Sequence, residues 1–108
     1  MDLSVIIVNW NTKDLLCQCI DSLTQTLGKF DTEVFVVDNG STDGSASAVR
    51  EKFPGVRLVE NPVNMGFAKA NNQAISLSSG EYLLFLNPDT QVKDDAIHKM
   101  LSFMDVHP

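Results

Sequence analysis

Side chains that could bind a ligand follow each of four short apolar runs in this 108-residue chain. Most are Asn, Asp, Ser or Thr, which also cap helices and form turns, so turn chemistry is an alternative for any one group. Turn chemistry does not require the aromatic ring of Trp10 or carboxylates at both Asp38 and Asp89. An aromatic ring, amides and carboxylates would together suit a nucleotide that carries a diphosphate and a divalent cation. The four groups are residues 9–12, 38–41, 60–62 and 87–90.

The apolar runs themselves predict β-strands. They are rich in β-branched residues and almost continuously apolar, which is typical of strands that are covered on both faces. The four predicted strands are residues 4–8, 34–37, 56–59 and 82–86.

Apolar residues at helical spacing separate these strands. The first helix is expected over 12–27, with Asn11 or Thr12 as N-cap and Gly28 as its stop. Further helices are expected over 43–52, over 67–79 and around 97–104. The faces predicted to be buried comprise Leu15, Leu16, Cys19, Ile20, Leu23 and Leu27 in the first helix, Phe67, Ala70, Ala74 and Leu77 in the third, and Ile97, Met100, Leu101 and Met104 in the fourth.

Strict alternation of strands and helices predicts one α/β domain over residues 1–108, with a parallel sheet and right-handed crossovers. Ligands of such sheets bind beyond the carboxyl ends of the strands. We therefore expect Trp10, Asp38, Asn39, Asn87 and Asp89 to converge at the edge where the first, second and fourth strands end.

Charge and composition exclude several classes of function. With 14 acidic against 8 basic residues the net charge is -6, which disfavours nucleic acid as a partner. An anionic ligand would then need a divalent cation or a nest of backbone N–H groups. No signal peptide and no membrane span is evident, so a cytoplasmic location is expected. Cys17 and Cys19 suit neither a disulfide nor a zinc site, and His98 and His107 lack metal-ligand spacing.

Motifs that the chain lacks narrow the nucleotide class. No G-x-G-x-x-G follows the first predicted strand, and no glycine precedes Gly28, which argues against a dinucleotide fold. The chain also has no G-x-x-x-x-G-K-[ST] phosphate loop and no G-x-S-x-G nucleophile elbow. The phosphates must therefore be held in another way. Hard cations such as Mg²⁺ and Mn²⁺ favour an arrangement in which one or two protein carboxylates and the ligand's phosphates bind the same ion.

Four stretches in order give the chain a resemblance to a known family. They read SVIIVNWN at 4–11, VVDNGSTDGS at 36–45, NPVNMGFAKANN at 61–72 and GEYLLFLNPDT at 80–90. With them the sequence resembles the N-terminal part of a family 2 glycosyltransferase of the GT-A fold, close to rhamnosyltransferase-like members. The resemblance implies the Rossmann-like nucleotide-binding half of that fold, with four parallel strands alternating with helices in an incomplete domain. It also implies inverting transfer of a sugar from a UDP-type or dTDP-type donor to an acceptor hydroxyl, in cell-surface polysaccharide synthesis.

The same resemblance assigns roles in nucleotide binding. Val8, Asn9 and Trp10 correspond to residues that cradle the base and ribose, and Asp38 and Asn39 to an acidic pair that reads the base imide. Asn39 departs from that pair, so an amide oxygen would accept the N3–H of a pyrimidine, and the choice between uridine and thymidine stays open.

The family's D-x-D-like metal motif falls on residues 87–89, where Asn87 replaces the first acid. The resemblance then makes Asp89 the expected ligand of Mg²⁺ or Mn²⁺, with Asn87 facing the ribose or sugar of the donor. A proline-containing turn is the alternative for this stretch, and an Asx turn is the alternative for Asp38.

The family pattern continues past residue 108. The general base is expected there, so no catalytic residue is assigned, and the chain is expected to be a fragment that binds the donor only. Its acceptor would be an unidentified carbohydrate or lipid-linked molecule, and the longer parent could work at the inner face of the membrane. An unfinished sheet leaves an open edge, which makes a homodimer plausible.

Two other classes of protein remain as alternatives. A receiver-like α/β module would use Asp38 or Asp89 for Mg²⁺ or for phosphorylation, but such a module needs acidic residues after the first strand, where this chain has Asn9 and Asn11. A nucleotidyltransferase would need a glycine-rich basic loop there, and none is present.

Overall fold

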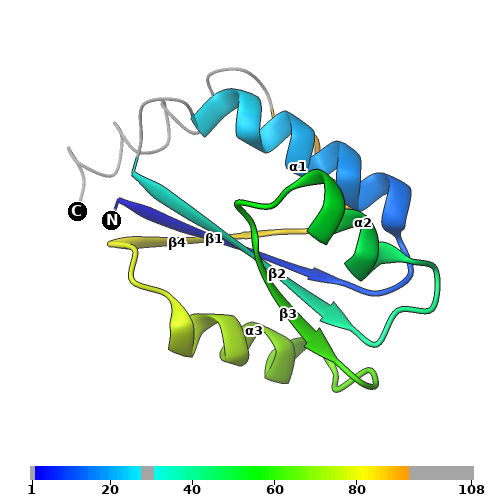
Figure 1. Ribbon diagram of the computed structural model, residues 1–108. Coiled ribbons are helices and arrows are strands. Elements are labelled where there is room, and N and C mark those ends of the chain that lie inside the picture. The colour runs from blue at the N-terminus through cyan, green and yellow to red at the C-terminus, as the bar shows by residue number, and fades with distance from the viewer. Residues whose placement is uncertain (1, 28–30, 93–108) are drawn as a thin grey trace.

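Strands and helices alternate along the whole described part of the chain, residues 2–27 and 31–92, in the computed structural model (Figure 1). The predicted strands and the first three predicted helices are confirmed to within two residues at each end. The expected stop at Gly28, the helix around 97–104 and both histidines lie outside the described residues. The elements are β1 (Leu3–Asn9), α1 (Lys13–Leu27), β2 (Thr32–Asn39), α2 (Ser45–Lys52), β3 (Arg57–Asn61), α3 (Phe67–Leu77) and β4 (Tyr82–Leu86).

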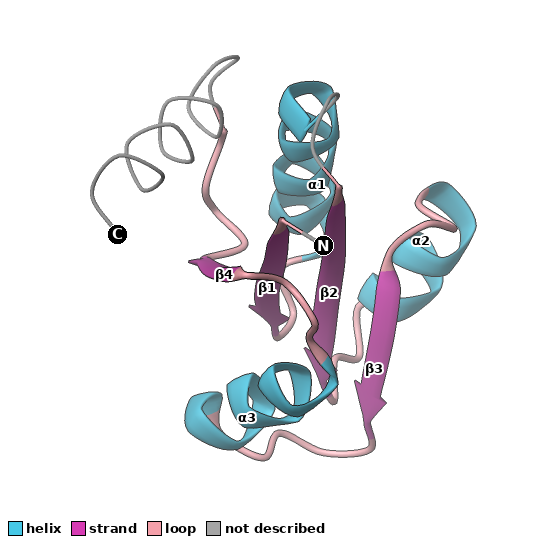
Figure 2. Cartoon of the chain, turned by 90° about the vertical axis from the view of Figure 1, so that its left-hand side faces the viewer, coloured by secondary structure: helices cyan, strands magenta, loops and turns pink. Residues whose placement is uncertain are grey.

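The strands form a single parallel sheet in the order β3-β2-β1-β4. The chain steps from β1 to β2 to β3 in one direction and then returns across the sheet to place β4 on the other side of β1. Helices α1 and α2 lie on one face of the sheet and α3 on the opposite face (Figures 1 and 2). The strand order thus reverses between β1 and β4, and ligands of open α/β sheets bind at such a reversal.

The two central strands are buried on both faces, but the prediction of double coverage is wrong for β3 and β4. Leu83 and Phe85 of β4 remain 41% and 47% exposed, and Arg57 and Glu60 of β3 are exposed. The reason is geometric, because α3 packs on β1 and β2 and leaves the same face of β4 uncovered. The homodimer expected from an open edge of the sheet stays a prediction.

Three apolar residues that were expected in the core are exposed. Leu15 is 44%, Phe67 63% and Leu77 56% exposed. In α3 only Ala70 and Ala74 are buried, and these small residues bring the helix close to β1 and β2. Leu15 precedes the buried Leu16 and therefore points about 100° away from it around the helix axis.

Glu33 fastens the α3–β4 loop to the amino end of the sheet. Its side chain is 6% exposed, and one carboxylate oxygen accepts the hydroxyl of Ser4 at 2.6 Å, the backbone N–H of Ser79 at 2.6 Å and the Ser79 hydroxyl at 3.1 Å. Ser4 Oγ in turn accepts the N–H of Gly80 at 2.8 Å. Burial by itself would raise the pKa of Glu33, but these hydrogen bonds and the Arg57 charge lower it.

Among the helices within the described ranges, none combines the length and the apolar character that a membrane crossing requires.

Candidate functional site

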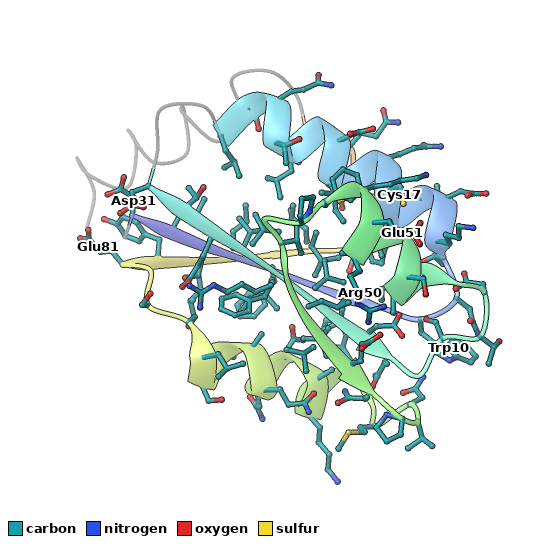
Figure 3. All side chains as sticks on the ribbon, in the orientation of Figure 1. Trp10, Cys17, Asp31, Arg50, Glu51 and Glu81 are labelled. Atoms are coloured by element: carbon teal, nitrogen blue, oxygen red, sulfur yellow. The ribbon has the colours of Figure 1, made fainter. Side chains whose placement is uncertain are left out.

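The carboxyl ends of β1, β2 and β4 meet at the edge where the strand order reverses. Asn9 lies opposite Asp38 across β1 and β2, and Ile7 lies opposite Leu86 across β1 and β4. Trp10 follows β1 at this edge (Figure 3), and its side chain is 54% exposed. The structure therefore places the three predicted strand ends together.

Asn9 and Asp38 form a buried pair on the α1 face of the sheet. Asn9 Nδ2 donates to Asp38 Oδ1 at 3.1 Å, and the side chains are 0% and 4% exposed. Asp38 also accepts the Ser41 hydroxyl at 2.7 Å and the Ser41 N–H at 3.1 Å. Asp38 thus forms the Asx-type turn that was the structural alternative for it, and at the same time it holds Asn9 in place.

Asn39 points to the opposite face, because successive side chains of a strand alternate. Its Oδ1 accepts the Met65 N–H at 2.9 Å and Asn61 Nδ2 at 3.3 Å. Its Nδ2 donates to Asn64 Oδ1 at 3.0 Å and to the Gly66 carbonyl at 3.3 Å. The amide that was expected to read a pyrimidine therefore holds the β3–α3 loop in this structure.

Asn61 adds a second amide contact to this loop. It exchanges two hydrogen bonds with Gln73 of α3, at 2.8 and 2.9 Å. This pair was not predicted, because nothing in the sequence shows which of its Asn and Gln residues face each other.

Gly40 packs against the main chain of the same β3–α3 loop. Its φ is +81°, and a Cβ at this position would lie 2.7 Å from the Val63 Cα and carbonyl carbon. We expect Gly40→Ala to lower the free energy of unfolding by about 2 kcal/mol, because alanine is strained at this φ and displaces the loop.

The matched control for this prediction is Gly55→Ala, where a Cβ would meet nothing within 4 Å. Its effect should stay within about 0.5 kcal/mol. Urea denaturation of both variants measures the difference, and equal stabilities would contradict the close contact at Gly40.

Asp43 ties the start of α1 to the loop before α2. It accepts the Lys13 N–H at 3.0 Å, the Ser45 N–H at 3.0 Å and the Ser45 hydroxyl. Burial alone would raise the pKa of Asp43, but these hydrogen bonds lower it. An open pocket of about 420 Å³ lies between the two segments, lined by residues 11–15 and Asp43. Asp43 thus accepts the N–H of the first residue of both α1 and α2 and links the two helix starts.

Asn87 and Asp89 lie in an exposed turn directly after β4. The Thr90 N–H donates to the Asn87 carbonyl at 3.0 Å, so the proline-containing turn is present. Within residues 2–27 and 31–92 no group donates a hydrogen bond to the Asp89 carboxylate. The Cys19 thiol contacts the same turn through the Asn87 carbonyl oxygen at 3.8 Å, and burial, followed by the Asp89 charge, raises the pKa of this thiol to about 11.

The donor set at this turn fits a divalent cation that is shared with a ligand. In the described part of the chain no three His, Cys, Asp or Glu side chains gather into a complete metal site. Mg²⁺ is commonly held by one or two carboxylates together with substrate phosphates, and Asp89, exposed and without a donor among the described residues, meets that requirement. Asp38 does not, since both of its oxygens accept hydrogen bonds within the protein.

The predicted residues therefore fall into three groups. Trp10, Asn87 and Asp89 are exposed at the carboxyl edge. Asn9 and Asp38 are buried together beneath it, whereas Asn39 and the half-buried Val8 face α3.

Comparison with known proteins identifies the family. The family described as Glycosyl transferase family 2 matches residues 4–108. The poly(ribitol-phosphate) beta-glucosyltransferase of Bacillus spizizenii is 36% identical over 108 residues, which cover 95% of this chain and 17% of that protein. The uncharacterized glycosyltransferase YibD of Escherichia coli is 36% identical over 94 residues, which cover 83% of this chain and 26% of YibD. The chain spans about a sixth of the length of the Bacillus relative.

Solved structures agree with this assignment. TarS 1–349 of S. aureus in complex with UDP superposes with a TM-score of 0.88 at 26% identity, over 99% of this chain and 33% of that one. The mannosyltransferase PcManGT of Pyrobaculum calidifontis, solved with GDP-Man and Mn²⁺, has a TM-score of 0.79 at 32% identity, over 88% of this chain and 30% of that one. The predicted fold, the N-terminal half of the GT-A type with four parallel strands alternating with helices, is thereby confirmed. By the match over residues 4–108, the chain belongs to glycosyl transferase family 2.

Proposed function

We propose that the carboxyl edge of this sheet binds the nucleoside diphosphate of a sugar donor. A longer protein containing the chain would then transfer the sugar to an acceptor hydroxyl with inversion. The observation that carries the proposal is that the exposed Trp10 and the exposed Asp89 turn follow the paired strands β1 and β4, between which the strand order reverses. The UDP complex of TarS and the GDP-Man and Mn²⁺ complex of PcManGT support it.

The predicted residues other than Asn39 have roles in this proposal that their surroundings allow. Trp10 offers an exposed aromatic face for stacking on the base, and Asn9, fixed by Asp38, supports the loop that carries it. Val8 would contribute its backbone from the second-to-last position of β1. A contact from Asn39 to the base requires its oxygen to release Met65 or Asn61, and this contact remains a prediction.

The phosphates are assigned to the turn after β4. Asp89 would hold Mg²⁺ or Mn²⁺, and Asn87 would face the ribose or sugar. When bound, such an ion neutralises charge that develops on the departing diphosphate. The chain itself supplies the negative ligand, and no residue within 2–27 and 31–92 donates a hydrogen bond to it, which favours binding of the ion there.

The partners of the reaction are also part of the proposal. The acceptor would be a carbohydrate or lipid-linked hydroxyl used in cell-surface polysaccharide synthesis, and the base that deprotonates it would lie beyond residue 108. The receiver-like alternative is disfavoured, because Asp38 is 4% exposed and hydrogen-bonded through both oxygens, so it is not placed to accept a phosphoryl group.

A panel of UDP, dTDP, GDP and ADP tests the proposal. At about five times its dissociation constant, a ligand that binds only the folded chain stabilises it by about 1 kcal/mol, or roughly 4 °C in melting temperature. We expect this shift with UDP and dTDP in the presence of Mn²⁺ and a much smaller shift without the ion. Equal shifts with GDP would contradict the preference for pyrimidines, and no shift with any of the four would contradict the site.

A further inference from the structure

Asn11 has an unusual backbone conformation. Its φ is +53°, and within residues 2–27 and 31–92 no other residue except glycine has a positive φ. Asn tolerates this left-handed conformation better than most residues do, but the conformation still has an energetic cost that the surroundings must offset. An exposed loop residue in this state therefore calls for a local cause.

Two hydrogen bonds to the β2–α2 loop supply that cause. The backbone N–H of Asn11 donates to Ser41 Oγ at 2.9 Å, and its side-chain Oδ1 accepts the Thr42 N–H at 2.8 Å. Ser41 is itself fixed by the buried Asp38. Asn11 is thus linked through Ser41 to the buried Asp38 at the carboxyl end of β2.

Trp10 lies between two fixed neighbours. Asn9 is buried and paired with Asp38 on one side, and Asn11 is fastened to Ser41 and Thr42 on the other. The Trp10 side chain is 54% exposed, so packing against the protein restrains its ring only in part. The main chain on both sides consequently sets the direction of the Trp10 Cα–Cβ bond and the rotamers that the ring can adopt.

We propose that Asn11 is a positioning residue that fixes the orientation of the Trp10 ring for stacking on the nucleotide base. The inference rests on the proposed function. A ring that is oriented before binding loses less conformational freedom when the base stacks on it, which favours affinity. The ordinary alternative is that Asn11 only closes the turn before α1, and the two differ in what happens to Trp10.

The chain allows a direct test, because Trp10 is its one tryptophan. The anisotropy decay of tryptophan fluorescence therefore reports on this ring alone.

Three variants separate the contributions of Asn11. Asn11→Gly permits the positive φ but removes the side-chain acceptor oxygen. Asn11→Ala removes the acceptor oxygen and also disfavours the positive φ, whereas Asn11→Asp keeps an acceptor oxygen. Asn72→Ala, at an exposed position of α3, is the matched control.

We expect Asn11→Ala and Asn11→Gly to increase the fast component of depolarisation of Trp10 in the absence of any ligand. Titration calorimetry with UDP and Mn²⁺ should show a dissociation constant raised about fivefold to tenfold by loss of preorganisation. Asn11→Asp should keep the anisotropy decay of the unmodified chain, and Asn72→Ala should change neither measurement. Should Asn11→Ala fail to fold, Asn11→Gly decides, since it retains the backbone conformation.

The outcomes separate this inference from the proposed function. If UDP binds the unmodified chain and neither Asn11→Ala nor Asn11→Gly changes the anisotropy decay, the positioning role is wrong. A fall in affinity would then have to come from a contact between Asn11 and the nucleotide itself. If none of UDP, dTDP, GDP and ADP binds the unmodified chain, the proposed function and the stacking role both fail. The anisotropy measurement then still shows whether Asn11 fixes Trp10.

Discussion

Replacing Glu33 with alanine is expected to lower the free energy of unfolding by about 3 kcal/mol, a fall in melting temperature of roughly 12 °C or more. The carboxylate accepts three hydrogen bonds from Ser4 and Ser79 in a place that is 6% exposed. Alanine leaves the fully buried Ser4 hydroxyl without this acceptor and opens a gap between the α3–β4 loop and the sheet. Thermal denaturation followed by circular dichroism measures the loss.

Glu60→Ala is the matched control. Glu60 pairs with Arg50, but both side chains are at least half exposed, at 50% and 57%. Surface pairs of this kind contribute little, so the control should change stability by about 0.5 kcal/mol or less. A Glu33 variant as stable as the Glu60 variant would show that the α3–β4 loop does not depend on this carboxylate.

The same carboxylate makes stability depend on pH in a defined direction. The pKa of Glu33 is lowered in the folded chain from its ordinary 4.5, so the unfolded chain binds its proton more readily. The contribution of Glu33 is therefore fully present above about 4.5 and is lost as the pH falls through the lowered pKa. Glu33→Gln removes this titration, and its stability should decline less steeply than that of the unmodified chain over the same range.

The order and type of the elements were predictable because each strand is a short β-branched run and each helix has a repeating apolar face. Burial was less predictable. Leu83 and Phe85 have the composition of a doubly covered strand, yet their exposure depends on where α3 crosses the sheet, which the sequence of β4 does not encode. Phe67 and Leu77 fit the helical period, but only Ala70 and Ala74 are buried in the contact between α3 and the sheet. The small alanine side chains set a short distance between the helix and the sheet, which leaves no room there for Phe67 and Leu77.

The site was predictable at the level of strand ends and not at the level of side-chain direction. Asp38 and Asn39 are adjacent in sequence and were assigned to one ligand, but alternation along β2 sends them to opposite faces. The importance of Asn11 depends on a backbone φ and on partners about thirty residues away. The one signal of this role in the sequence was that asparagine tolerates the left-handed backbone conformation. That property does not distinguish Asn11 from the chain's other asparagines.

Replacing Asp89 with asparagine is expected to abolish the metal-dependent part of nucleotide binding while leaving the fold intact. The carboxylate is exposed and accepts no hydrogen bond from the described residues, so the amide should change the free energy of unfolding by about 0.5 kcal/mol or less. An amide oxygen has no net charge, and the chain already has a net charge of -6 that opposes a diphosphate. Titration calorimetry with UDP, with and without Mn²⁺, should give the same dissociation constant for the variant in both conditions.

Asp21→Asn makes the same change of charge at an exposed position of α1 and should keep the response to Mn²⁺. In a longer protein that contains this chain, Asp89→Asn should reduce sugar transfer by about 100-fold or more, whereas the 108-residue chain should transfer no sugar in either form. If Asp89 only shapes the turn after β4, the variant should instead melt at a lower temperature and keep its dependence on Mn²⁺. Measurable transfer by the 108-residue chain would place the general base within it and contradict the assignment of that base to a later segment.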